Sequence, residues 1–204
     1  MTRTWPRLAI APVLLTLPAA AAITCDLNSP ATDVPRLFPG ATRFKTTYFS
    51  VTGPDLQKVL RRLGEPNRPL YEPLEVPYTL YEIFKGDARA GYIHGINQKG
   101  QFGVIQVFLA LDLQGRVITF YIQKMTGPLA PKLRDPAFAG QFTALSLRDF
   151  RTFDPVLGKG TGRLAKIRNP VPGMDTDFFG VLRGLYKNLV LMDACFYSHA
   201  GDPA

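Results

Sequence analysis

The sequence predicts an α+β fold: an antiparallel β-meander sheet with short helices and a long C-terminal helix packed on it. Two observations predict this class. Residues 78–123 consist of aromatic and β-branched runs separated by turn residues, which is typical of consecutive antiparallel strands. Residues 176–197 repeat apolar side chains at helical spacing. With 46% hydrophobic and 20% charged residues, the chain can form an ordinary buried core.

The first 22 residues have the layout of a signal peptide. Arg3 and Arg7 supply positive charge, an apolar stretch follows, and small residues up to Ala22 offer a cleavage site. The apolar stretch is shorter than the about 20 residues that span a bilayer, so a cleaved signal is favoured over the alternative, an uncleaved anchor. We therefore expect an exported, periplasmic or otherwise extracytoplasmic protein whose mature part, residues 23–204, forms a single domain.

The formal net charge of the chain is +8 at neutral pH. A positive excess suits an anionic ligand or a membrane surface. The charge is spread along the chain, and no basic stripe with interleaved aromatic residues is present. Nucleic acid is therefore not an expected partner.

The two cysteines, Cys25 and Cys195, stand near the two ends of the mature chain. In an oxidising compartment the simplest interpretation is one disulfide that ties the N-terminus to the final helix. The competing interpretation makes Cys25 a lipid-modified N-terminus, although Thr24 stands where a smaller residue is expected. Two cysteines this far apart do not form a metal-site pattern, and no metal is expected.

The first predicted element of the mature domain is a helix within residues 50–66. Thr52 and Asp55 have the spacing of a capping box, and Gly64 can end the helix. The apolar residues at helical spacing are Leu56, Val59, Leu60 and Leu63. Four prolines within residues 65–77 then indicate a loop or an edge segment.

The predicted meander follows, with turns in "KGDARAG", "NQKGQ" and "DLQG". Both faces of the strand at residues 104–111 are apolar, so we expect it to be central and covered on both sides. One face has Ile105, Val107, Leu109 and Leu111, and the other has Val104, Gln106, Phe108 and Ala110. In the next strand we expect Ile118, Phe120 and Ile122 on one face, and Val117, Thr119, Tyr121 and Gln123 on the other.

Two more helices are predicted after the meander. Asp135 and Pro136 suit the N-cap and first position of a short helix. Residues 146–175 are irregular, with room for a short strand in their basic part. The final helix is capped by Asp175 or Thr176. One of its faces is lined by Phe178, Leu182, Leu185, Leu189 and Met192.

The sequence contains no common catalytic motif that clearly predicts an enzyme class. His94 and His199 have no metal-ligand spacing. We expect His94 to be a partly exposed structural residue in a strand turn, and His199 to lie in the frayed C-terminus. The absence of a G-x-S-x-G motif disfavours a nucleophilic hydrolase. The glycine-rich stretch 158–162, "GKGTG", could cradle a phosphate, but it lacks the P-loop order and is better interpreted as a flexible loop.

The loop after the last predicted strand is the better candidate for a site. Residues 124–142 supply Thr126 and Gly127 at the strand end, Lys132 and Arg134 as cations, and the start of a short helix. Backbone N–H groups and cations together can hold an anion. The alternative is a loop that only caps the end of the sheet.

Over residues 34–142, the order of segments resembles the FMN-binding domain family. The resemblance rests on "LFPGATRF", on "GYIHG", on a hairpin with Asp112, Gly115 and Val117, and on "DPAFAGQF" with Phe138, Gln141 and Phe142. This family includes periplasmic flavin-carrying subunits of the sodium-pumping quinone reductase and of ferredoxin-oxidising membrane complexes. No single one of these motifs is rare, and it is their order that resembles the family.

The resemblance implies a flavin site, FMN as the cofactor and a membrane-bound redox partner. It implies an electron-transfer protein without substrate turnover of its own, in which the polypeptide anchors the phosphate and tunes the ring. Its implied contacts are Thr126, Gly127 and Leu129 near the ring, Gln141 or Phe142 beneath it, and Thr176 with Lys132 near the phosphate.

Two departures from the family pattern define the alternative. The acidic Glu-Thr-Pro-Gly segment is replaced by "KMTGPL", and the Ser-Gly-Ala-Thr flavinylation motif is replaced by "NPVPGMDTDFF". Non-covalent flavin is therefore expected rather than a bond through Thr176. The alternative is an exported binding or assembly module of the same fold that holds no flavin.

Overall fold

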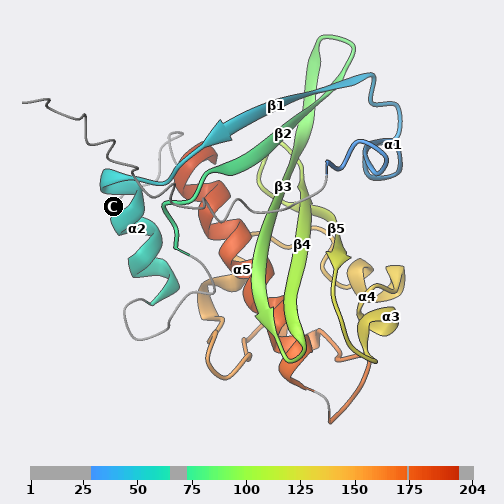
Figure 1. Cartoon of the computed structure of the whole chain (residues 1–204), viewed down its shortest axis with the longest axis vertical. Helices are drawn as coiled ribbons and strands as arrows, with labels where there is room; N and C mark the ends of the chain where they lie inside the picture. The colour runs from blue at the N-terminus through green and yellow to red at the C-terminus, as the bar shows by residue number, and fades with distance from the viewer. Residues whose placement is uncertain (1–28, 65–72, 174, 198–204) are drawn as a thin grey trace, which may run out of the picture.

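The computed structural model describes residues 29–64, 73–173 and 175–197. Its centre is a five-stranded antiparallel sheet in which every strand pairs with the next one along the chain. The strands are β1 (Arg43–Phe49), β2 (Tyr78–Lys85), β3 (Ala88–Gly100), β4 (Gly103–Leu111) and β5 (Val117–Lys124). With helices packed around the sheet (Figure 1), the predicted α+β meander is confirmed.

The helices surround this sheet. Early in the chain come α1 (Val34–Leu37) and α2 (Gly53–Leu63). After β5 come α3 (Ala130–Leu133), α4 (Pro136–Gly140) and two 3₁₀ turns, η1 (Asp149–Thr152) and η2 (Leu164–Lys166). The long helix α5 (Asp175–Met192) continues into a π-helical turn, η3 (Asp193–Tyr197). None of the helices in the described ranges combines the length and apolar character needed to cross a bilayer.

Helix α5 lies across one face of the sheet, over β3 and β4 (Figure 1). Two glycines allow this close approach. A Cβ at Gly180 would stand 3.1 Å from the carbonyl oxygen of Lys99, and one at Gly184 would stand 3.2 Å from Val107 Cγ2. The buried residues of α5 extend around most of its circumference, beyond the single predicted face, because the sheet, α2 and the 146–173 segment all pack on it.

Both faces of β4 are buried, as the sequence predicts. Ile105, Val107, Leu109 and Leu111 belong to the main core under α5. Phe108 and Ala110 belong to a smaller core on the opposite face, which α1 and Phe38 cover. The two layers of helix therefore bury the central strands from both sides.

The predicted faces of β5 are partly wrong. Phe120 and Ile122 face the main core as expected, but Val117 joins them and Ile118 packs on the smaller core instead. The cause is an irregularity in the β4–β5 register between Ala110 and Leu111. An extra residue in one strand reverses which face the following side chains occupy.

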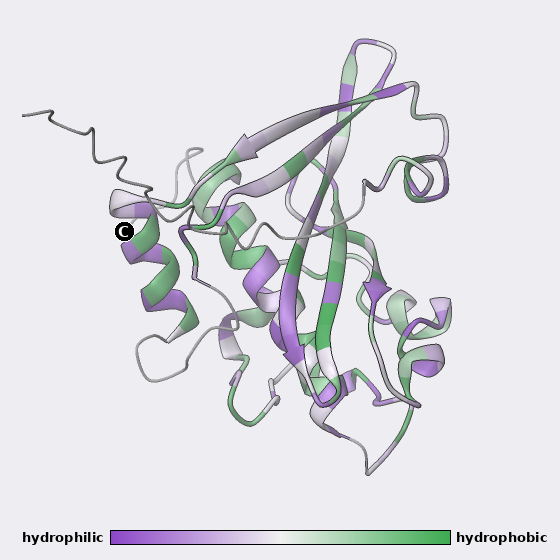
Figure 2. Cartoon of the chain, viewed as in Figure 1, coloured by the Kyte–Doolittle hydropathy of each residue, from purple (hydrophilic) through white to green (hydrophobic). Residues whose placement is uncertain are grey.

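Helix α2 begins and ends as predicted, although its cap differs. Thr52 occupies the N-cap position in extended conformation, but its side chain makes no capping hydrogen bond. Gly64 ends the helix in the left-handed conformation, with φ of 80°. Apolar and polar residues alternate along the helix (Figure 2), and its apolar Val59 and Leu63 are buried in the main core.

Candidate functional site

The loop after β5 is a packed turn at the tip of the β3–β4 hairpin. Gly127 has φ of 122°, and a Cβ there would stand 2.5 Å from the ring of Phe102, so the loop backbone lies directly on that ring. Thr126 is exposed, whereas Leu129 is buried in the main core. Of the three expected ring contacts, Thr126 is on the surface, Gly127 is partly covered and Leu129 faces inward.

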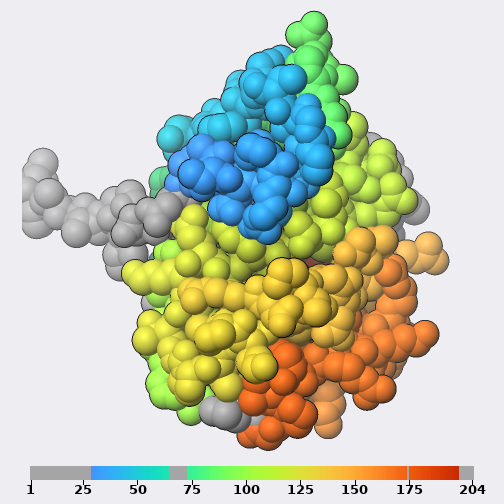
Figure 3. Space-filling view, turned by 90° about the vertical axis from the view of Figure 1, so that its right-hand side faces the viewer, coloured from blue at the N-terminus to red at the C-terminus, as the bar shows by residue number. Residues whose placement is uncertain are grey.

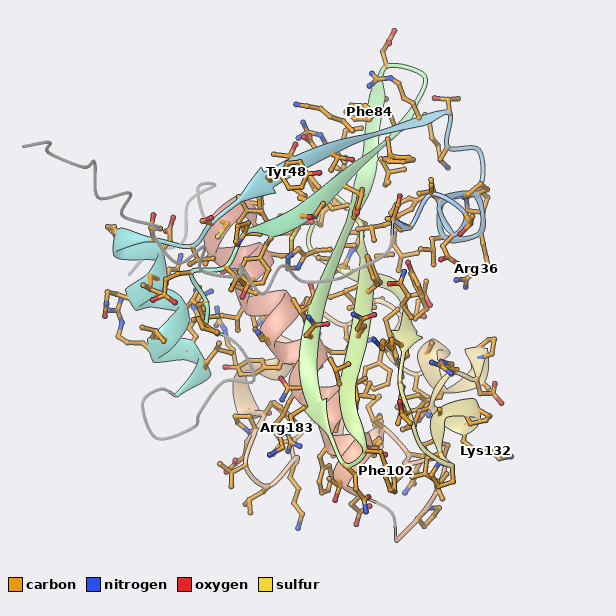
Figure 4. The ribbon with its side chains drawn as sticks, in the orientation of Figure 1. Arg36, Tyr48, Phe84, Phe102, Lys132 and Arg183 are labelled. Carbon is orange, nitrogen blue, oxygen red and sulfur yellow. The ribbon has the colours of Figure 1, made fainter. Side chains whose placement is uncertain are left out.

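The two cations of this loop have different surroundings. The guanidinium of Arg134 donates to the carbonyl oxygens of Ile122 (3.0 Å) and Met125 (3.4 Å), so it holds the loop against the end of β5. Lys132 extends outward from α3 into solvent (Figure 4). Lys132 is therefore the cation of this loop that can meet a ligand.

Helix α4 is anchored through its aromatic residues. Asp135 caps it, because its carboxylate accepts a hydrogen bond from the backbone N–H of Ala137 at 2.8 Å. Phe138 and Phe142 are buried and lie edge-on to each other and to Phe120, with ring centroids 5.2–5.8 Å apart. Phe142 thus faces the core, away from the surface where a ligand would bind.

Gln141 links α4 to the segment that leads into α5. Its side-chain amide donates to the carbonyl oxygen of Arg168 at 3.2 Å, and its Oε1 accepts from the N–H of Arg168 at 2.7 Å. Further along this segment, Asn169 donates to the carboxylate of Asp175 at the start of α5 at 2.8 Å. Thr176 is exposed in the first turn of α5.

These segments together form a shallow concavity of about 230 Å³, which we call the α4 concavity. It is lined by Lys132, Asp135, Ala137, Phe138, Gln141 and Pro170. In Figure 3 the yellow surface of α3 and α4 meets the orange segment that precedes α5. The structure therefore brings Lys132 and Gln141 to one hollow, with Thr126 and Gly127 on the neighbouring loop and Leu129 and Phe142 in the core.

The stretch 158–162 has its own hydrogen bonds. Asp154 pairs with Lys159 in an isolated bridge, and its carboxylate accepts from the N–H groups of Val156 and Leu157. In the described part of the irregular segment, residues 146–173, this bridge and the two 3₁₀ turns take the place of the short strand. Gly158 lies against the ring of Phe179, so it is a packing position rather than a phosphate cradle.

A second hollow, which the sequence interpretation missed, lies at the other end of α5. This cavity has a volume of about 400 Å³, and we call it the arginine cavity. Arg62, Arg148 and Arg151 line it, together with apolar side chains such as Leu111, Leu189 and Met192. In the sequence, the one indication of this cavity is the Arg-x-x-Arg spacing of Arg148 and Arg151. That spacing is too common to predict a site unless the fold is known.

The expected exposure of His94 and its expected place in a strand turn are wrong. The residue lies in the middle of β3, opposite Leu109, and is fully buried. Its Nδ1 lies 2.7 Å from Oδ1 of Asn188 on α5, and the rings of Phe49 and Tyr78 lie beside it. Because β3 continues unbroken through "GYIHG", the expected turn does not form, and α5 covers this face of the strand.

Burial sets the protonation of His94. Its pKa is lowered to about 4, mainly by loss of hydration; the hydrogen bond to Asn188 acts in the opposite direction, and nearby Lys187 contributes to the lowering. The imidazole is therefore neutral at physiological pH. Its role is structural, because it joins β3 to α5.

The predicted disulfide cannot be followed in the structure, because Cys25 lies outside the described residues, as do His199 and the signal peptide. Cys195 is half-buried in η3 against the main core. The pKa of its thiol is raised to about 11, mainly by burial and in part by Asp55, whereas Lys58 acts in the opposite direction. The disulfide and the lipidated N-terminus both remain predictions.

Comparison with known proteins found no matching family model and no matching curated sequence. A function is therefore inferred from the residues of this chain.

Proposed function

We propose that this chain is an exported redox accessory protein that holds FMN, non-covalently, at the α4 concavity. The observation that supports the proposal is the meeting of three separate segments at this hollow: the loop after β5, α4 and the approach to α5. Of these, α4 carries motif residues of the resemblance to flavin-carrying proteins, whereas the loop after β5 and the approach to α5 are where two motifs of that family are replaced. When bound, FMN would supply one- or two-electron transfer.

The residues present fit the phosphate end of FMN better than its ring. Lys132 is exposed at the rim and can pair with a phosphate as a mobile point charge. The exposed side chains of Lys166 and Arg168 come from the segment bonded to Gln141 and add positive charge nearby. Gln141 is committed to Arg168, so it shapes the hollow and leaves no free amide for the ring.

The ring would lie on the surface of the protein. Its expected neighbours Thr126 and Gly127 are on the adjacent loop, where backbone groups can contact a flat ligand. The concavity of about 230 Å³ is smaller than the pockets of roughly 300 Å³ and more that enclose most ligands. A flavin held there would therefore be largely exposed, which suits exchange of electrons with a docked membrane-bound partner.

The small volume of the α4 concavity also supports a second candidate, a binding or assembly module of this fold that carries no flavin. A small hollow, together with burial of Leu129 and Phe142, leaves few groups to grip an isoalloxazine ring. In that case the surface around α3 and α4 would be a contact surface for another protein.

The deciding experiment is an absorption spectrum of the exported protein before and after acid precipitation, followed by titration of the colourless protein with FMN. Yellow absorbance released into the supernatant supports non-covalent FMN. Colour that stays with the pellet means covalent attachment, with Thr176 the first residue to substitute. No absorbance and no binding of added FMN would overturn the flavin proposal in favour of the binding module.

A further inference from the structure

The arginine cavity is built from four parts of the chain that are distant in sequence. The C-terminal end of α2 supplies Arg62, and the β4–β5 turn supplies Gln114 and Gly115. The Ser146–Arg151 segment supplies two arginines, and α5 with η3 supplies the inner wall. Its volume of about 400 Å³ lies within the range of small-molecule sites.

The charges of this cavity do not cancel. Arg62 is committed to Asp193, whose carboxylate it contacts directly. Arg148 and Arg151 are exposed, and their side chains form no hydrogen bond or ion pair with the residues that the structure describes. Two guanidinium groups therefore remain available at the rim.

These two arginines lie side by side. Arg148 is the N-cap of the 3₁₀ turn η1 and Arg151 is three residues later, and side chains three residues apart in a 3₁₀ helix eclipse each other. Both side chains line the same cavity. A pair of guanidinium forks in this arrangement suits one carboxylate, sulfonate or phosphate group.

The segment that carries the arginines is braced before any ligand binds. Asp149 accepts hydrogen bonds from the N–H and the hydroxyl of Ser146, at 2.8 Å and 3.1 Å. Just before it, Ala144 has φ of 60°, a left-handed conformation that non-glycine residues rarely adopt. The carbonyl of Ala144 accepts from Arg163 at 2.8 Å, and its N–H donates to Val117 at 2.7 Å. This rigid turn fixes the direction from which the arginines project.

The floor of the cavity is apolar. Leu111, Leu189 and Met192 are buried beneath it, and Tyr186 forms a wall held by stacking on Phe150. Inorganic phosphate would satisfy the arginines and leave this floor uncovered. A ligand with an anionic head and an apolar body would use both parts.

We propose that the arginine cavity binds an amphipathic organic acid, with its anionic group on Arg148 and Arg151 and its alkyl or aryl body on the apolar floor. This site is separate from the α4 concavity. It lies at the C-terminal end of α5, whereas the α4 concavity adjoins the segment before the N-terminal end. The proposal therefore stands whether or not the protein carries flavin.

The test is fluorescence titration of the full exported protein with 8-anilinonaphthalene-1-sulfonate, an aromatic sulfonate. We expect one saturable site and displacement of the probe by octanoate. Replacing both arginines (Arg148→Ala with Arg151→Ala) should weaken binding by about tenfold or more, because charge-assisted hydrogen bonds are lost. The lysine pair Arg148→Lys with Arg151→Lys should restore part of the affinity, since it keeps the charge without the fork.

The matched control removes two positive charges elsewhere, through Lys85→Ala with Lys159→Ala. Both lysines are exposed, and neither lines the cavity. Equal weakening by the control pair, or unchanged affinity in the arginine pair, would overturn the proposal. Displacement by inorganic phosphate as effective as displacement by octanoate would overturn the amphipathic class of ligand.

Competition between FMN and the fluorescent probe distinguishes the arginine-cavity proposal from the flavin proposal. If FMN displaces the probe, and if Lys132→Glu leaves FMN affinity unchanged, the flavin occupies the arginine cavity. That result would support the cavity as an amphipathic-anion site and overturn the α4 concavity as the flavin site. If FMN binds without displacing the probe, the two sites are independent, as proposed.

Discussion

The hollows near the two ends of α5 differ in how much of their chemistry is already used by the fold. At the α4 concavity, Arg134 is bonded to the end of β5 and Gln141 to Arg168, so Lys132 is the main group left for a ligand. At the arginine cavity, Arg62 is paired with Asp193, but Arg148 and Arg151 face the cavity without partners among the described residues. The sequence resemblance points to the first hollow, whereas volume and charge point to the second.

The comparison shows that residues that carry a sequence resemblance can serve the fold itself. Phe138, Gln141 and Phe142 carry much of the resemblance, and all three hold α4 in place. A residue with such a task can be retained when a ligand is lost. An unpartnered charge beside an apolar floor is a more direct indication of binding, because no contact within the fold already uses the charged group.

The largest expected effect tests whether Phe142 serves the core or the ligand. Phe142→Ala should lower the free energy of unfolding by about 3–5 kcal/mol, because it leaves a cavity between Phe120 and Phe138. Chemical denaturation measures this, with the exposed Thr126→Ala as the control. A Phe142→Ala protein of normal stability that has lost FMN binding would place Phe142 in the site instead.

The next effect is on the pH dependence of stability. It concerns His94, which lies in β3 beneath α5. Folding lowers its pKa from the ordinary 6.5 to about 4, so unfolding takes up a proton between these pH values. This contribution to stability is fully present above pH 6.5 and is lost as the pH falls toward 4. At about 1.4 kcal/mol per pKa unit, the loss is about 3 kcal/mol.

Unfolding free energies measured between pH 7 and pH 4 test this prediction. The part of the slope of unfolding free energy against pH that comes from His94 should disappear in His94→Gln, whatever the absolute stability of that variant. NMR titration gives a second readout, because the ring of His94 should not titrate above pH 5. An unchanged slope in the variant would assign the acid sensitivity to other groups.

A smaller effect is expected at the rim of the α4 concavity. Lys132→Glu should weaken FMN binding by about fivefold or more, because it places a negative charge beside the phosphate. It should not alter stability, since the side chain is exposed. Lys85→Glu makes the same charge change on a distant strand end and serves as the control in calorimetric titration. Equal affinities in the two variants would remove Lys132 from the flavin site.

The smallest effect is expected for a glycine in place of Ala144, beside the arginine cavity. Ala144→Gly relieves the left-handed backbone but makes the unfolded chain more flexible, so stability should rise by about 0.5 kcal/mol or less. Ala144→Val should lower stability by more than about 1 kcal/mol, because a β-branched residue tolerates this conformation poorly. Urea midpoints distinguish the two directions, and a stabilised valine variant would show that the turn is not strained.

Local pattern alone predicted most of the secondary structure. Some features depend only on residues close together in the chain, so the sequence pattern is enough to predict them. They are the glycine turns of the meander, the Gly64 end of α2 and the Asp135 cap of α4. The apolar faces of β4 follow from the two-residue period of a strand. The same reasoning failed at Val117 and Ile118, because a register irregularity depends on the partner strand as well.

Only the tertiary structure decided which polar groups are buried, paired or available. His94 becomes a neutral core residue because α5 covers it and removes it from water, although its hydrogen-bond partner Asn188 is almost a hundred positions away in the chain. Arg148 and Arg151 become a pair facing an apolar floor because η1 docks beside the end of α5. Desolvation and long-range pairing depend on distances between remote segments, and the order of residues along the chain does not contain those distances.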